Sequence, residues 1–315
     1  MAGHFEKGYA LVIGVANYPK IRKLSEKVLK DTKDMYELLI SPNYCGYRDA
    51  NTQKLLDKQA TADNIRNKLQ WLAQSAGSDS TAVIFFSGHG GQIEHGDDAG
   101  NYLLPYDCDP DNLSKTSISG VEFTKLLRDI KAERLLVCFD CCHSGGVGEP
   151  KKLIVDQLEL KSGFDEAYYD QLAQGTGRII IASSRPEEIS WIVPDLDNSL
   201  FTHYLLEALR GKGRHRGDGL IRVSDVFEYV SEKVPQHEYN QKSELQHPLL
   251  KTYTETFFPI SLFLGGTKTV SKPAAPTHSE SSFVTKPTSV KKSDILQFLY
   301  QFHPYALLLQ NQTPF

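Results

Sequence analysis

The sequence lacks the long apolar segments that membranes require. No stretch approaches the roughly 20 consecutive apolar residues of a membrane-spanning helix, and residues 1–8 hold no apolar segment of signal-peptide length. Basic residues are not in excess either, because 35 Lys and Arg stand against 39 Asp and Glu, for a net charge of −4. The sequence therefore predicts a cytoplasmic protein that binds neither membranes nor nucleic acid.

Cysteine is also scarce. Only five are present among 315 residues, and three of them lie between residues 138 and 142. An odd total, with three cysteines in one cluster, excludes a disulfide framework and favours a reducing compartment. With 40% hydrophobic and 23% charged residues, the composition is that of an ordinary globular protein long enough to bury a large core.

Continuous apolar runs alternate with segments of helical spacing. The runs predict strands, and the periodic segments between them predict amphipathic helices. This alternation is typical of a mainly parallel β-sheet with helices on both faces, an α/β/α sandwich. The main strands are expected at residues 8–15, 81–86, 134–139 and 178–183, and the main helices at 24–39, 61–76, 119–130, 199–209 and 224–233.

Two polar segments directly follow two of these strands. Residues 87–90 (SGHG) follow one, and residues 140–145 (DCCHSG) follow the other. Because the carboxyl ends of parallel strands meet at one edge of a sheet, His89 and Cys142 are expected to lie close together. A thiolate attacks an amide carbon, and one imidazole can take the thiol proton and pass it to the departing amine. We predict Cys142 as nucleophile, His89 as base and acid, and the backbone amides of Gly90 and Cys142 as the oxyanion hole.

Other interpretations of these residues remain open. Cys138 is expected to be a small core residue, and His95 and His143 are the next candidates for the base. A zinc site is the alternative to a nucleophile, although adjacent cysteines chelate one ion awkwardly, so no metal is expected. Its ligands would be His89, Cys141, Cys142 and His143.

Both segments resemble the two motifs of the metacaspases and of their bacterial relatives, the orthocaspases, in the caspase–haemoglobinase clan. The resemblance covers roughly residues 8–265, including 10–18 and 199–209. The Gln-Ala-Cys-Arg-Gly motif of animal caspases is absent. The resemblance implies a caspase-like fold and a cysteine endopeptidase that works through a thioester. The alternative is a latent or catalytically weak caspase-like interaction or signalling protein that a partner activates.

The resemblance also suggests a specificity pocket. Ser87 and Asp140 lie two positions before the proposed base and nucleophile, and the resemblance adds Asp31 to the same pocket. Two carboxylates in a partly desolvated pocket favour a substrate cation, so cleavage is expected after Arg or Lys in peptides or proteins. Trp191 either forms the wall of a neighbouring pocket or covers the core.

The resemblance divides residues 1–265 into three parts. A large-subunit-like portion covers about 1–150, a linker about 147–177, and a small-subunit-like portion about 178–265. Exposed basic residues in a linker suit self-cleavage by such a protease, although an ordinary surface loop is equally compatible with them. The candidate self-cleavage sites are Lys151, Lys152 and Lys161.

The remaining residues change in composition. Residues 266–292 are rich in Ser, Thr, Pro and Lys and predict a flexible linker. Residues 293–315 are apolar and aromatic again, and predict either a docking segment for a regulatory partner or the start of a further domain.

No cofactor is expected. Many metacaspases need calcium, and four loop carboxylates here could supply oxygen ligands. The denser acidic loop motif of that family is missing, so these side chains are expected to be solvated, with calcium activation as the alternative. The four are Asp97, Asp98, Asp107 and Asp109.

Overall fold

The structure is a computed structural model. It describes residues 5–141, 152–155, 158–186, 188–214, 216–242 and 245–262, and for residues 152–155, 158–162 and 241–242 the backbone alone. All of them belong to one compact unit, Met1–Val270. The predicted linker at 266–292 and the predicted docking segment at 293–315 lie outside the described residues.

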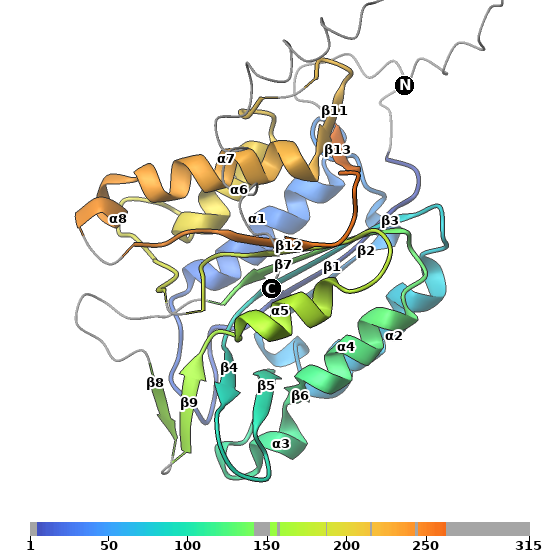
Figure 1. The fold of residues 1–315 in the computed structure, drawn as a ribbon. Coiled ribbons are helices and arrows are strands. Elements are labelled where there is room, and N and C mark those ends of the chain that lie inside the picture. The colour runs from blue at the N-terminus through green and yellow to red at the C-terminus, as the bar shows by residue number, and fades with distance from the viewer. Residues whose placement is uncertain are drawn as a thin grey trace, which may run out of the picture. The chain divides into compact units, whose positions relative to one another are not determined.

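A six-stranded sheet forms the centre of this unit (Figure 1). Its strand order is β12-β10-β7-β3-β1-β2, and every neighbouring pair is parallel except β10 and β12, which are antiparallel. The prediction of a mainly parallel sheet is therefore confirmed. The strands are β1 (Gly8–Gly14), β2 (Thr52–Leu56), β3 (Thr81–Ser87), β7 (Arg134–Asp140), β10 (Arg178–Ala182) and β12 (Leu249–Thr252).

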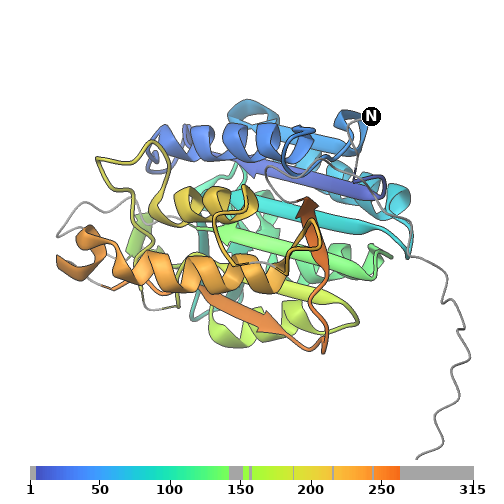
Figure 2. The ribbon, with the colours of Figure 1, turned by 90° about the horizontal axis from the view of Figure 1, so that it is seen from above.

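Helices cover both faces of the sheet, as the sequence predicts (Figures 1 and 2). The sheet therefore has a hydrophobic cluster on each face. β3 contributes side chains to both clusters, which is why its sequence is apolar throughout. Ile84 and Phe86 belong to one cluster, whereas Val83 and Phe85 belong to the other, because successive strand residues point to opposite faces. One face carries α1 (Lys27–Ile40), α6 (Leu200–Leu209) and α7 (Val223–Gln236), and the other carries α2 (Ala62–Ser75), α4 (Gly120–Asp129) and α5 (Glu166–Ala173).

Small polar residues begin three of these helices. The side chains of Thr61, Ser119 and Ser199 accept hydrogen bonds from backbone amides three residues further on, at the starts of α2, α4 and α6. Such bonds satisfy amides that have no partner inside the helix. The helix starts predicted from these residues are confirmed, and Ser199 has a further contact at the candidate site.

A second sheet of five antiparallel strands lies beside the first, in the order β6-β5-β4-β9-β8. Its last two strands and α5 fall within the segment predicted as a linker at 147–177, so the described part of that segment is structured instead. β9 pairs with β4, and β8 pairs with β9, so the backbone groups of both strands have partners. The strands are β4 (Gly90–Ile93), β5 (Gly100–Leu103), β6 (Ile118–Ser119), β8 (Lys152–Val155) and β9 (Leu158–Ser162).

The remaining elements are short. They are α3 (Leu113–Thr116), α8 (Glu238–Lys242), and the antiparallel pair β11 (Leu220–Arg222) and β13 (Pro259–Leu262). Among the described residues, no helix has the length and apolar character needed to cross a bilayer.

Candidate active site

The carboxyl ends of three central strands meet at one edge of the sheet. Ser87, the last residue of β3, is the register partner of Asp140, the last residue of β7. The amide of Gly88 donates a hydrogen bond to the Asp140 carbonyl (3.4 Å), and the Ser183 amide, just after β10, donates to the Phe139 carbonyl (2.8 Å). The segments that follow these strands therefore all start at the same edge.

His89 follows β3 by two residues, and its ring is held through one nitrogen, Nε2. Its Nε2 lies 2.8 Å from the backbone carbonyl oxygen of Arg22, which can only accept a hydrogen bond. Nε2 therefore carries the ring proton, and Nδ1 is the nitrogen with a free lone pair. Burial lowers the pKa of His89 to about 4, so the ring is neutral at neutral pH and can accept a proton.

Tyr18 fixes the backbone and ring of His89, a role that was not predicted. Its hydroxyl accepts a hydrogen bond from the His89 amide (2.8 Å) and donates one to the Leu104 carbonyl (3.1 Å). The two rings lie 4.8 Å apart between centroids. Tyr18 belongs to the segment 10–18 that resembles metacaspases, but no periodicity or spacing indicates a contact 71 residues away.

The glycines on either side of His89 are required by close packing. A Cβ atom at Gly88 would lie 2.9 Å from the Tyr18 hydroxyl oxygen, and one at Gly90 would lie 2.9 Å from the ring of Phe164 and 3.0 Å from Cys141 Sγ. Any side chain there would displace the neighbours of His89. The predicted oxyanion role of the Gly90 amide remains a prediction.

Cys142 and His143 lie outside the described residues, which reach Cys141. Cys141 itself is buried, and burial raises the pKa of its thiol above the ordinary value. Cys138 lies inside β7 and is also buried with a raised thiol pKa, as expected for a small core residue. A buried thiol that resists ionisation is a poor nucleophile, so neither competes with Cys142. His95 is exposed between β4 and β5.

Asp31 and Asp140 come together from distant parts of the chain. Both side chains are completely buried, Asp31 on α1 and Asp140 at the end of β7. Ser199 joins them, because its amide donates to Asp31 Oδ1 (3.1 Å) and its hydroxyl donates to Asp140 Oδ2 (2.5 Å). We call these two carboxyl groups the acidic pair.

The two carboxyl groups differ in their partners. Asp140 accepts from three hydroxyls, those of Ser190 (3.0 Å), Ser199 and Thr202 (2.6 Å). For Asp31, burial and the nearby charge of Asp140 raise the pKa to about 8. Beside Asp140, the buried Asp31 carboxyl therefore favours its protonated, neutral form. The three hydroxyl residues were not predicted, since a buried serine or threonine leaves no sequence signal.

Ser87 and Trp191 are both buried near this edge. The Ser87 hydroxyl has no hydrogen-bond partner in the described part of the chain. The Trp191 side chain is 2% exposed, packs against the Tyr239 ring (5.4 Å between centroids), and belongs to the hydrophobic cluster that contains α1, α6 and α7. This placement fits the alternative in which Trp191 covers the core, and its predicted role at a neighbouring pocket stays a prediction.

The four loop acids do not gather into one site. Asp97 and Asp98 are exposed between β4 and β5, Asp107 accepts from the Ala62 amide at the start of α2 (2.9 Å), and Asp109 pairs with Lys20 (2.5 Å). Among the described residues, no group of three or more His, Cys, Asp or Glu side chains could hold a metal ion. Two candidate zinc ligands, Cys142 and His143, lie outside those residues.

Of the candidate self-cleavage sites, Lys151 lies outside the described residues. Lys152 begins β8 and Lys161 lies in β9, and the two are register partners in the second sheet. They therefore lie in paired strands at the edge of that sheet and not in an irregular loop.

Comparison with known proteins gives the family. Residues 7–255 match the caspase domain, so this chain belongs to the caspase-domain family of cysteine peptidases. Its curated relatives include metacaspase-4 of Arabidopsis thaliana, 32% identical over 167 residues, and metacaspase-1 of Candida albicans, 30% identical over 154 residues. These matches cover 50% and 44% of this chain and 38% and 33% of the relatives. The resemblance to metacaspases is confirmed, and the chain spans well under half the length of either relative.

The fold is similar to that of a crystal structure of a protein from Geobacter sulfurreducens. The match has a TM-score of 0.53 at 20% identity and covers 79% of this chain and 94% of the other. At this identity the likeness concerns the fold alone, and it confirms that the sheet and its helices form a known arrangement.

Proposed function

We propose that this chain is a cysteine endopeptidase that cleaves peptides or proteins after Arg or Lys. The observation that carries the proposal is the acidic pair, Asp31 and Asp140, buried at the same strand edge from which His89 and Cys142 follow. Buried carboxylates are costly unless they meet a cation, and a substrate guanidinium or ammonium supplies one. Arg gains more than Lys from paired hydrogen bonds to a carboxylate.

The chemistry uses two side chains. His89 Nδ1 takes the proton of the Cys142 thiol, and the sulfur forms a bond to the substrate carbonyl carbon. The protonated imidazole then gives its proton to the leaving amine, which departs and leaves a thioester on Cys142. Water, deprotonated by the same imidazole, attacks the thioester and releases the acid and the thiol. The amides of Gly90 and Cys142 donate to the oxyanion in both steps. These steps need no metal ion or organic cofactor.

The direct test is a set of fluorogenic peptides that end in Arg, Lys or Asp, assayed with and without added calcium. We expect cleavage of the Arg and Lys peptides by the wild-type chain, and none by the Cys142→Ala variant. Cleavage after Asp would contradict the specificity. No cleavage under any condition would favour the alternative, an interaction protein that uses this fold without catalysis. If cleavage depends on calcium, the alternative in which the loop acids bind calcium would be favoured.

Self-processing follows from the same specificity. The wild-type chain, but not Cys142→Ala, should yield fragments that end at Lys151, Lys152 or Lys161. Mass spectrometry of the new termini identifies the bond, and an active chain that stays whole would contradict self-processing. Removal of residues 266–315 tests the regulatory role of the C-terminal segment, since unchanged activity and oligomeric state would argue against it.

A further inference from the structure

Gln246 has a fully buried side-chain amide and lies in the short connection between α8 and β12, outside the residues proposed for catalysis. Its side chain binds both ends of one segment, residues 183–191, which connects the end of β10 to the surroundings of the acidic pair. Nε2 donates to the Ser183 carbonyl (2.8 Å), and Oε1 accepts from the Trp191 amide (2.9 Å). A single side chain thus closes this segment into a loop.

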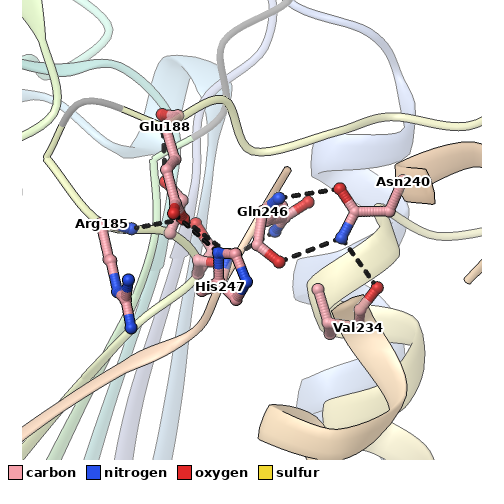
Figure 3. Close-up of polar contacts among 8 residues, drawn as sticks. Arg185, Glu188, Val234, Asn240, Gln246 and His247 are labelled. Atoms are coloured by element: carbon pink, nitrogen blue, oxygen red, sulfur yellow. Dashed lines mark hydrogen bonds and ion pairs between the residues drawn. The ribbon is translucent and has the colours of Figure 1, made fainter. Parts of the chain in front are cut away.

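Gln246 is itself fixed by Asn240, as Figure 3 shows. The Gln246 amide donates to Asn240 Oδ1 (2.7 Å), and Asn240 Nδ2 donates to the carbonyls of Gln246 and Val234 (both 3.0 Å). Val234 lies in the last turn of α7, where carbonyls have no partner within the helix. The buried pair of amides therefore connects the end of α7 to the 183–191 segment with its hydrogen-bonding groups satisfied.

The contact between Gln246 and Ser190 determines which acceptor the Ser190 hydroxyl hydrogen points to. Gln246 Nε2 lies 3.3 Å from Ser190 Oγ, and an amide nitrogen can only donate. Ser190 therefore keeps its single hydroxyl hydrogen for Asp140 Oδ1, 3.0 Å away. Without Gln246 the hydroxyl would be free to turn toward other acceptors, and Asp140 would lose a fixed donor.

A second contact holds the same segment nearer the surface. The Glu188 carboxylate accepts from the His247 amide (2.6 Å), lies 2.7 Å from His247 Nδ1, and accepts more weakly from the Arg185 amide (3.4 Å; Figure 3). Two consecutive residues, Gln246 and His247, therefore bind the 183–191 segment, one in the interior and one nearer the surface.

We propose that Gln246 is a positioning residue for substrate selection: it holds Ser190, and through Ser190 the carboxylate of Asp140, in the orientation that receives the substrate cation. The proposal rests on the proposed function, because it assigns Gln246 to the site that selects Arg or Lys. Gln246 touches neither substrate nor the reacting atoms and acts through Ser190 and Asp140. A purely structural role is the competing explanation.

The test is Gln246→Met, which keeps the side-chain length and removes the amide. We expect the KM for the Arg peptide to rise about 10-fold or more, because the variant removes the bonds of Gln246 to the Ser183 carbonyl, the Trp191 amide and the Ser190 hydroxyl. The change in kcat should be smaller, and the preference between Arg and Lys should be altered. The rate at which iodoacetamide alkylates Cys142 should stay that of wild type, because the variant leaves Cys142 and His89 intact. Mass spectrometry of the Cys142 peptide measures that rate.

Tyr47→Phe is the matched control. It removes buried hydrogen bonding as well, in this case the bond from the Tyr47 hydroxyl to the Ile260 carbonyl (3.0 Å), but at the opposite end of the sheet, near the start of β1. This variant should lower the melting temperature and leave KM and the Arg-to-Lys preference unchanged. If Gln246→Met behaves like Tyr47→Phe, or loses alkylation and all cleavage together, Gln246 is structural and the proposal is wrong.

A second variant keeps the test decisive if Gln246→Met does not fold. Ser190→Ala removes only the hydroxyl that Gln246 directs, and it should raise the KM for the Arg peptide several-fold; an unchanged KM would overturn the proposal. Failure of the proposed function looks different, because the wild-type chain itself would then cleave neither Arg nor Lys peptides.

Discussion

Ser87 and Asp140 are register partners at the carboxyl ends of two adjacent parallel strands, β3 and β7. The proposed base, His89, follows Ser87 by two residues, and the proposed nucleophile, Cys142, follows Asp140 by two residues. Both segments therefore begin at neighbouring positions of the sheet. The same strand ends carry Ser87 and Asp140, two of the buried side chains that we propose for selection of the substrate. In the proposed function, catalysis and specificity therefore both depend on one pair of strand ends, and a change in the register of β3 against β7 should disturb both.

Replacement of His89 tests the base. His89→Ala should lower kcat/KM by about 10²–10⁴-fold, because the proposed mechanism assigns the thiol proton to the His89 imidazole. Hydrolysis of the Arg peptide measures the loss. His95→Ala is the control, since His95 is exposed, and it should retain wild-type activity. If His95→Ala loses activity and His89→Ala does not, His89 is not the base.

Removal of the Tyr18 hydroxyl tests the positioning of His89. Tyr18→Phe keeps the ring but leaves the His89 amide and the Leu104 carbonyl without this partner, at a cost of about 1–3 kcal/mol in the free energy of unfolding. We expect a lower melting temperature together with a several-fold lower kcat. Tyr47→Phe, which removes a comparable buried bond far from His89, should lower stability alone. Equal kcat values in the two variants would contradict the positioning role.

The pKa of Asp31 predicts how stability depends on pH. Burial raises this pKa to about 8, whereas in the unfolded chain it has its ordinary value of about 4. The unfolded chain therefore releases a proton that the folded chain keeps. The resulting contribution to the free energy of unfolding is full below about pH 4 and is lost as the pH rises to about 8.

Asp31→Asn should remove this slope and, at pH 8, raise the free energy of unfolding by at least the ~1.4 kcal/mol that one pKa unit represents. Urea denaturation at pH 5.5 and pH 8 measures both quantities. Asp34→Asn is the matched control on the same helix, where Asp34 is partly exposed and paired with Lys30 (2.6 Å). Parallel pH slopes in wild type and Asp31→Asn would refute the assignment.

Close packing around Gly90 gives a further prediction. In Gly90→Ala the added methyl group meets Phe164 and Cys141 Sγ at about 3 Å, and such overpacking costs about 1–3 kcal/mol. Thermal denaturation should show a lower midpoint, and activity should fall because Gly90 adjoins His89. Gly77→Ala is the control, since a Cβ there would meet only Asp79 Oδ1, at 3.7 Å. A Gly90→Ala variant as stable and active as Gly77→Ala would contradict the packing argument.

The strong apolar signals were enough to predict much of the fold. β1, β3, β7 and β10 lie where continuous apolar runs predict them, because a strand covered on both faces must be apolar at every position. The strands β8 and β9 escaped prediction, since their residues belong to a mostly polar stretch. They form a hairpin, and β9 joins the second sheet by pairing with β4. The pairing of β9 with β4 joins distant residues, such as Gly91 and Ser162, and leaves no local signal.

The sequence by itself determined the fold class and the family, and it predicted the chemistry of His89, because local apolar periodicity and two short motifs carry that information. Only the tertiary structure decided which polar groups meet. It placed Asp31 beside Asp140, joined them through Ser199, and connected Gln246 to Ser190. Buried polar contacts depend on how distant segments pack and on which donor faces which acceptor, and neither is encoded in the spacing of residues along the chain.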